Sequence, residues 1–380
     1  MVCLVLLTSC SAEDKTEISG AVDFDLKRSQ FEQLDGWREE NLEDFAPALN
    51  GVCDYIKIKK ISYLKSNRFS YSLSDYHRHC AVMKDIKNPT ELKKYIESHF
   101  VPYLVVSKGN DEGKFTSYYE ANIRASLVKD AKYRYPIYGK PNDLVEVNLR
   151  DFDRNLPNKR LVGRVKDGKL IKYYTREEID KGVLDAPVIL WGDDPVDIYI
   201  MQIQGSAIAT LPDGKEVRVG YAENNGHSFR GIGSILIEKG LIKPKDSSMP
   251  KVREWLRNNG DAAHKNMLLN NRFIFHKIVK ADGPIGAMGL PLVAGRSIAI
   301  DKKYIPLGSM VWLETSSPDG KKIHKMVMAE DVGSAIKGAV RGDYFWGQGE
   351  DALHYAGRMN SSGRYFILLP RNTGVDFYER

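Results

Sequence analysis

Short strand-like runs dominate the chain from residue 101 onward, and they limit its fold more than any other feature. Segments such as YPIYGKPNDLVEVNL, FIFHKIV, MVWLET, IHKMVMAED and RYFILLP are separated by Gly, Asp and Asn. One helical block, residues 228–270, interrupts these strands, and the sequence contains no repeat of fixed period. We therefore expect a mainly β protein whose strands lie before and after a central helical block.

Local patterns predict several individual elements. Alternating side chains over residues 196–204 predict a strand, and Pro, Asp and Gly in residues 211–214 predict a hairpin turn into a strand at 217–221. Near the N-terminus, apolar residues at spacings of three and four predict helices over 31–49, 52–64 and 90–100.

The length of 380 residues exceeds what a single hydrophobic core usually organises, which favours two domains. Hydrophobic residues make up 42% and charged residues 28%, a balance typical of a folded globular protein. The net charge of +6 is spread along the chain rather than gathered in a tract, so we expect no nucleic-acid partner. This positive charge could attract an anionic glycan as a partner, or it could belong to a solvated surface that has no partner.

The first residues, MVCLVLLTSC, are typical of a bacterial lipoprotein signal in which Cys10 is lipidated and becomes the new N-terminus. An apolar N-terminal tail is the alternative, because the usual basic start of a signal is missing. No stretch approaches the roughly 20 apolar residues needed to span a bilayer. We expect residues 1–10 to be the signal, and residues 11–44 to be a tether, polar through residue 30, followed by a helical segment.

Apart from Cys3 in this signal and Cys10, the chain contains two cysteines, Cys53 and Cys80. Outside the cytoplasm they could be bridged, and two buried free thiols are the alternative. Residues 77–80 read His-Arg-His-Cys, but no second cluster stands at ligand spacing, so we predict no metal site.

Three aspartates, Asp301, Asp331 and Asp343, each follow a strand-like run and stand among glycines. Loops held by a rigid sheet can place such side chains in a cleft, although a single Asp is more often a turn former. If Asp331 and Asp343 lie close together, like charge and burial beside Phe345 and Trp346 would raise the pKa of one of them. A carboxyl group that stays protonated can donate the proton that cleavage of a glycosidic bond requires.

Glycosidases ordinarily use a second carboxylate as nucleophile or base. One acid is enough when the substrate brings its own nucleophile, because an intramolecular hydroxyl acts at an effective concentration of ~10⁵ M or more. In murein, the C6 hydroxyl of N-acetylmuramic acid (MurNAc) can be that nucleophile. The same carboxyl group would then act first as acid and afterwards as base.

Four motifs resemble the membrane-bound lytic murein transglycosylase A family: QIQGSA (202–207), YAENNG (221–226), GRSIAIDKKYIPLGS (295–309) and AEDVGSAIKGAVRGDYFWGQGEDA (329–352). The C-terminal third is similar to the domain named for three aspartates. The resemblance implies a double-psi β-barrel built from residues 45–117 and 282–380, with a mainly β domain inserted at 118–281. It further implies that glycan lies in the groove between the two domains.

The resemblance also implies roles for individual residues. Asp343 corresponds to the catalytic acid and base, Asp331 lies close to it, and Asp301 and Lys337 support the site. Lys337 could instead pair with Asp331, which would oppose the rise in pKa. The motifs, together with FTSYYEAN (115–122), predict contacts with the glycan from Tyr118, Tyr119, Glu120, Gln204, Gly205, Ser206, Tyr221, Asn225, Phe345, Trp346 and Gly347. Trp346 has an equally good interpretation as a core residue.

We therefore predict a lytic transglycosylase that cleaves the β-1,4 bond between MurNAc and N-acetylglucosamine and leaves 1,6-anhydroMurNAc ends. Two alternatives remain open: a noncatalytic peptidoglycan-binding protein, and an inverting hydrolase that uses Asp343 and Asp331 as a pair. No cofactor is expected. The predicted location is the outer membrane, facing the periplasm through a lipid anchor, with the wall-synthesis machinery as a further candidate partner.

Overall fold

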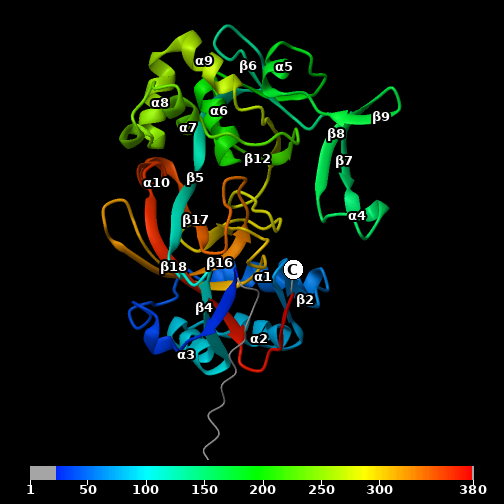
Figure 1. Ribbon diagram of the computed structural model, residues 1–380. Coiled ribbons are helices and arrows are strands. Elements are labelled where there is room, and N and C mark those ends of the chain that lie inside the picture. The colour runs from blue at the N-terminus through cyan, green and yellow to red at the C-terminus, as the bar shows by residue number, and fades with distance from the viewer. Residues whose placement is uncertain (1–22, 379–380) are drawn as a thin grey trace, which may run out of the picture.

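Six strands close into a barrel in the lower half of the computed structural model, which describes residues 23–378 (Figure 1). In their order around the barrel, they are β18 (Asn360–Pro370), β15 (Met310–Ser316), β16 (Lys322–Asp331), β14 (Ser297–Ile300), β17 (Arg341–Gln348) and β5 (Gly113–Ser126). The start of β18 pairs with the start of β5, Asn360 lying opposite Thr116. This second pairing closes the ring, so each of the six strands has a neighbour on both sides.

We call residues 23–117 and 282–378 the barrel lobe, and residues 118–281 the upper lobe. The buried apolar cluster of the barrel lobe takes its members only from residues 24–115 and 288–369, and Trp312 at its centre is fully buried. Of three smaller clusters, two lie wholly in the upper lobe, and the third also takes Ala352 and Ala356 from the barrel lobe. Because burial of apolar surface is the main stabilising contribution to folding, we infer that the two lobes are separate domains with boundaries near residues 117 and 281.

The N-terminal part of the barrel lobe covers the outside of the barrel. It contains β1 (Asp25–Arg28), η1 (Phe31–Gln33), α1 (Ala46–Ile58), β2 (Tyr63–Lys65), β3 (Phe69–Ser72), α2 (Ser74–Asp85), α3 (Pro89–His99) and β4 (Phe100–Val106). β1 pairs with β4, which in turn pairs with β18. Near the other end of the chain, the barrel lobe adds α10 (Gly349–Ala356) and β19 (Val375–Phe377), and β19 pairs with β3.

Two predictions for the N-terminal region are wrong. The tether predicted as far as residue 30 overlaps β1, and Phe24 and Leu26 are buried in the barrel lobe. The helix predicted over 31–49 is mostly a series of turns, from which Trp37, Leu42 and Phe45 reach the core. Apolar spacing alone did not distinguish these turns from a helix, because either conformation can direct such residues inward.

The helix predicted over 52–64 ends early, since α1 stops at Ile58, and α2 was not predicted. The helix predicted over 90–100 is confirmed as α3. The Asn88 side chain caps it by accepting hydrogen bonds from the backbone amides of Thr90 and Glu91 at 2.9 and 3.2 Å.

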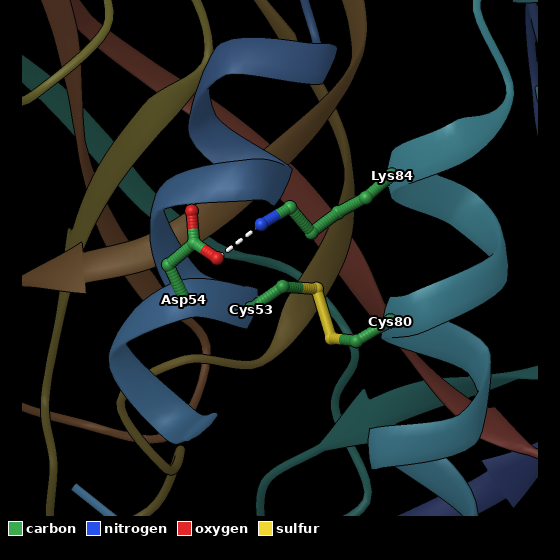
Figure 2. The surroundings of a disulfide bond; sticks show 4 residues. All are labelled: Cys53, Asp54, Cys80 and Lys84. Atoms are coloured by element: carbon green, nitrogen blue, oxygen red, sulfur yellow. Dashed lines mark hydrogen bonds and ion pairs between the residues drawn. A yellow bond between two sulfur atoms is a disulfide. The ribbon is translucent and has the colours of Figure 1, made fainter. Parts of the chain in front are cut away.

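A disulfide links α1 to α2 through Cys53 and Cys80, whose Cα atoms are 5.5 Å apart (Figure 2). Of the two alternatives that the sequence left open, the structure therefore has the bridge. Beside it, Lys84 of α2 forms an ion pair with Asp54 of α1 (Figure 2). The disulfide and the ion pair together hold α1 against α2 on the outside of the barrel.

The upper lobe extends the barrel sheet through the second half of β5. It contains β6 (Tyr135–Tyr138), β7 (Leu144–Asn148), α4 (Leu149–Phe152), β8 (Arg160–Lys166), β9 (Lys169–Lys172), α5 (Arg176–Asp180), β10 (Val188–Gly192), α6 (Pro195–Gln204), β11 (Ala207–Thr210), β12 (Glu216–Asn224), α7 (Ile232–Glu238), η2 (Pro244–Asp246), α8 (Met249–Asn258), α9 (Gly260–Leu268) and β13 (Ile274–Val279). β11 lies parallel to β5 and forms the predicted hairpin with β12. β5 thus belongs to the sheet of both lobes.

The strand predicted over residues 196–204 is wrong, because these residues form helix α6. Asp194 caps this helix by accepting a hydrogen bond from the Val196 amide at 2.8 Å, and Pro195 occupies its first position. Gly205 ends it with a φ of 93°, a conformation that favours glycine. Buried side chains lie on every face of α6, so alternation carried no information about its period.

No helix within residues 23–378 combines the length and apolar character needed to cross a bilayer. Cys10 and the rest of the predicted signal lie outside the described residues.

Candidate active site

The register of three barrel strands aligns two of the predicted aspartates. Ala299 of β14 pairs with Asp331 of β16 on one side and with Asp343 of β17 on the other. One strand therefore separates the two acids, which puts their backbones about 10 Å apart. Asp331 ends its strand and Asp301 follows β14, as predicted, but Asp343 lies within β17 rather than in a loop.

A cavity of about 660 Å³ lies above these strands, with walls from both lobes. Nine of the predicted site residues line it: Tyr118, Gln204, Gly205, Ser206, Tyr221, Asp301, Asp331, Lys337 and Asp343. The acids belong to the wall formed by the barrel lobe. Gln204, Gly205, Ser206 and Tyr221 form part of the opposite wall, in the upper lobe.

The carboxyl group of Asp343 is half-buried and has one side-chain partner, Thr116, which donates a hydrogen bond to its Oδ1 atom. The Arg341 guanidinium donates in turn to the Thr116 hydroxyl at 2.7 Å. Burial raises the pKa of Asp343, while the Thr116 hydrogen bond and the Arg341 charge lower it; the balance is a raised pKa. A larger fraction of this carboxyl group is therefore protonated near neutral pH than for an ordinary Asp.

Both oxygens of Asp331 accept hydrogen bonds. The Tyr118 hydroxyl donates to Oδ2 and the Ala287 amide donates to Oδ1, each at 2.9 Å. Burial raises the pKa of Asp331 to about 6; the hydrogen bonds oppose this shift and the nearby Asp343 adds to it. The predicted pair between Lys337 and Asp331 is not among the ion pairs of residues 23–378, and the Lys337 side chain is exposed.

Glu330, the neighbour of Asp331, is a buried acid that sequence analysis did not single out. Its side chain is 1% exposed and accepts a hydrogen bond from the Ser297 hydroxyl at 2.5 Å. Burial raises the pKa of Glu330 to about 8, so it is mostly neutral at pH 7 and adds little negative charge beside Asp331.

Asp301 supports the loop that follows β16. Its side chain is 4% exposed and accepts hydrogen bonds from the backbone amides of Lys303 at 3.1 Å and Gly338 at 3.0 Å. The contact with Gly338 ties the segment between Asp331 and Asp343 to the end of β14. Asp301 thereby fixes the shape of the cavity wall near both acids.

The aromatic residues after Asp343 pack inside the protein and do not line the cavity. Phe345 lies 5.1 Å from the ring of Tyr118, and Trp346 stacks on Tyr355 at 4.7 Å. Gly347 adopts a φ of 96° at a close approach to Ala294. Phe345, Trp346 and Gly347, predicted to contact the glycan, are therefore not among the residues that line this cavity, and Phe345 packs against Tyr118 instead.

Three further predicted contacts are buried away from the cavity. Glu120 forms an ion pair with Arg218 at 2.9 Å, and Tyr119 is 4% exposed in the core of the upper lobe. The Asn225 amide donates to the backbone carbonyls of Tyr174 and Asn271, both at 2.8 Å. These contacts hold the upper lobe together.

Comparison with known proteins identifies the family. Residues 114–277 match the family model described as the MltA specific insert domain, and residues 296–369 match the 3D domain. A membrane-bound lytic murein transglycosylase A homolog from Buchnera aphidicola is 30% identical over 325 residues, which cover 82% of this chain and 81% of the relative. The chain belongs to the membrane-bound lytic murein transglycosylase A family.

Solved structures of the family agree with this assignment. MltA from Neisseria gonorrhoeae, in a monoclinic crystal form, has a TM-score of 0.81 at 29% identity, with 96% of this chain and 97% of that chain covered. A membrane-bound lytic murein transglycosylase from Agrobacterium tumefaciens also has a TM-score of 0.81, at 28% identity, covering 91% and 98% of the two chains. The predicted fold class, a double-psi β-barrel with an inserted second domain, is confirmed.

Many residues that line the cavity of this transglycosylase family member were not predicted from sequence, among them Thr116, Arg176, Arg272 and Arg341. Thr116 lies in the FTSYYEAN motif and Arg341 lies two positions before Asp343, so both stood beside recognised signals. Arg176 and Arg272 stand in no motif, and only the fold brings them together. Within residues 23–378, no group of His, Cys, Asp and Glu is arranged to hold a metal ion.

Proposed function

We propose that this protein is a lytic transglycosylase of murein in which Asp343 acts first as general acid and then as general base. In the first step Asp343 donates its proton to the glycosidic oxygen as the bond between that oxygen and C1 of MurNAc breaks, and N-acetylglucosamine leaves with the protonated oxygen. In the second step the Asp343 carboxylate accepts the proton of the MurNAc C6 hydroxyl as that oxygen attacks C1. The observation that carries this proposal is the position of Asp343 at the cavity between the lobes, with side-chain bonding in the described residues only at Oδ1; burial also raises its pKa.

The hydrogen bonds of the two aspartates favour Asp343 over Asp331 as the acid. Asp331 accepts one hydrogen bond on each oxygen, and both bonds stabilise its ionised form. Among the described residues, side-chain bonding to Asp343 involves only Oδ1, which leaves Oδ2 for the proton and the substrate. We assign Asp331 an electrostatic role, since its negative charge favours the protonated form of Asp343 and would stabilise positive charge on the sugar ring.

Residues of the opposite wall are the proposed contacts with the glycan. Gln204, Gly205, Ser206 and Tyr221 line the cavity from the upper lobe, as does Tyr118 at the start of that lobe. A glycan held between the two walls would have its sugar hydroxyl and acetamido groups within reach of these polar side chains. Such positioning matters because the C6 hydroxyl must lie close to C1 for the intramolecular attack.

Digestion of purified sacculi tests the proposal directly. Mass spectrometry of the soluble products should find muropeptides that end in 1,6-anhydroMurNAc, each lighter by one water than the product of hydrolysis. Reducing ends alone would indicate the inverting hydrolase, for which the strand spacing of the two acids leaves room. Binding without any soluble product would indicate the noncatalytic alternative. The Asp343→Asn variant, assayed in parallel, should release product far more slowly than the wild type.

We further propose that a lipid on Cys10 anchors the chain to the outer membrane, with the folded lobes in the periplasm. The relatives are named membrane-bound, and the lipoprotein-like start of this sequence supports the same location. Fractionation of cells that express the wild type and the Cys10→Ser variant would test the anchor. The wild type should sediment with membranes and remain there after a high-salt wash, whereas sedimentation of the variant to the same extent would disprove the anchor.

A further inference from the structure

Arg176 is a buried cation in the wall of the cavity that the catalytic proposal does not use. Its side chain is 7% exposed, and its guanidinium lies between the rings of Tyr199 and Phe273, at 4.7 and 5.0 Å from their centroids. Nε donates to the Asn270 carbonyl at 3.0 Å and Nη2 to the Arg272 carbonyl at 2.6 Å. These contacts fix the guanidinium plane before any ligand binds.

Arg272, the second guanidinium of this wall, is also partly buried. Its Nη1 atom donates to the His227 carbonyl at 3.1 Å. The pKa of the Arg272 guanidinium is lowered, mainly by burial. Both Arg176 and Arg272 line the cavity, on the wall that faces Asp331 and Asp343.

Neither guanidinium is paired with a carboxylate in the described part of the chain. Two acids exert an electrostatic effect on these guanidinium groups, but both are already bound to other residues. Glu223 accepts two hydrogen bonds from Arg160, at 2.7 and 2.8 Å, and Asp180 pairs with His264 at 2.9 Å. An arginine that is more than nine-tenths buried ordinarily has an anionic partner, because burying an unpaired charge is costly.

We propose that Arg176 and Arg272 form a subsite for a carboxylate of the muramyl unit. This inference rests on the proposed murein substrate and adds a specificity element to it. Two sources supply a carboxylate in murein: the lactyl group of MurNAc once its peptide is removed, and the stem peptide while it is attached. Arginine suits either source, because its planar fork binds a carboxylate with two parallel hydrogen bonds.

The test measures binding rather than turnover, so that its outcome does not depend on the catalytic proposal. In the Asp343→Asn background, dissociation constants are measured by fluorescence anisotropy for labelled glycan strands at 0.15 M salt. One arm compares peptide-free strands before and after amidation of the lactyl carboxylates. A second arm makes the same comparison for the stem carboxylates of strands that keep their peptides.

Amidation should weaken binding at least about tenfold in the arm that contains the recognised carboxylate, the factor expected for one charge-assisted hydrogen bond. Adding Arg272→Gln should reduce that ratio to near one. The matched control is Arg134→Gln, which removes an exposed guanidinium of the same lobe that does not line the cavity and should leave the ratio unchanged. A ratio near one in both arms, or a ratio that survives Arg272→Gln, would overturn the subsite.

Arg176→Lys provides a second variant, because it keeps the charge but cannot reach both carbonyls and a ligand together. It should weaken binding of the charged strand and leave binding of the amidated strand unchanged. An equal loss for both strands would show that Arg176 only holds the Asn270–Arg272 backbone in place, and would restrict the subsite to Arg272. Failure of sacculus digestion in the experiment above would instead disprove the catalytic proposal, so the two failures are distinguishable.

Discussion

The two walls of the cavity differ in charge and in the way their side chains are held. The barrel wall carries Asp331 and Asp343 on the two strands that flank β14 in a closed sheet. Asp343 is paired on both sides, with Ala299 and Thr116, and Asp331 is paired with Ala299. The upper wall carries Gln204, Arg176 and Arg272 at the ends of helices and strands. This difference suggests that the rigid wall performs the chemistry, whereas the opposite wall recognises the substrate.

Substitution of the proposed acid should have the largest effect on activity. We expect Asp343→Asn to slow release of anhydromuropeptides by about 10²- to 10⁴-fold, the usual contribution of a general acid or base. The matched control is Asp319→Asn, at an exposed turn of the same lobe, which should retain wild-type activity. Equal activity of the two variants would remove the catalytic role from the barrel wall.

Loss of the second carboxylate should have a smaller effect that depends on pH. Activity requires protonated Asp343, so it should fall as pH rises through the pKa of that group. Asp331→Asn removes a neighbouring negative charge, which lowers the pKa of Asp343 and moves the alkaline limb of the pH-rate profile to lower pH. We expect activity at neutral pH to fall by about 10- to 100-fold. An alkaline limb at an unchanged pH would contradict the electrostatic role.

Thr116→Val should move the same limb in the opposite direction. The Thr116 hydrogen bond stabilises the ionised carboxylate, so its removal raises the pKa of Asp343 and extends activity to higher pH. At neutral pH the rate should change less than about tenfold, because the acid itself remains. A shift to lower pH would show that Thr116 acts on Asp343 in some other way.

Removal of the disulfide should affect the stability of the barrel lobe and leave activity almost unchanged. Replacing both Cys53 and Cys80 by Ala opens a link across 27 residues, which should lower the free energy of unfolding by about 3 kcal/mol. Denaturant unfolding, followed separately by proteolysis of each lobe, would show which lobe opens first. Earlier opening of the upper lobe in this variant would indicate that the two cores are not independent.

The elements that were predicted correctly from the sequence are those in which the turn and capping residues indicate the same element as the apolar pattern. The strands around Asp301 and Asp331 were predicted because their apolar runs end at turn residues, and α3 was predicted because Asn88 and Pro89 mark its start. Helix α6 was missed because it is buried on every side, although Asp194, Pro195 and Gly205 marked both of its ends.

The candidate site divides in the same way. Its acids stand in recognisable motifs, and these motifs carried the resemblance to the family. The sequence could not show whether a motif residue faces the cavity. Phe345 and Trp346 stand in the same motif as Asp343, yet they pack inward. Arg176 and Arg272 are 96 positions apart, and the carbonyl contact between them depends on the path of the whole upper lobe.

The continuous strand β5 has a mechanical consequence. Its first half closes the barrel and its second half pairs with β11, so strand pairing passes from one domain into the other, with a register shift between Tyr118 and Glu120. Any change in the gap between the two walls would therefore bend β5 at this register shift, the point at which the strand passes from one domain to the other.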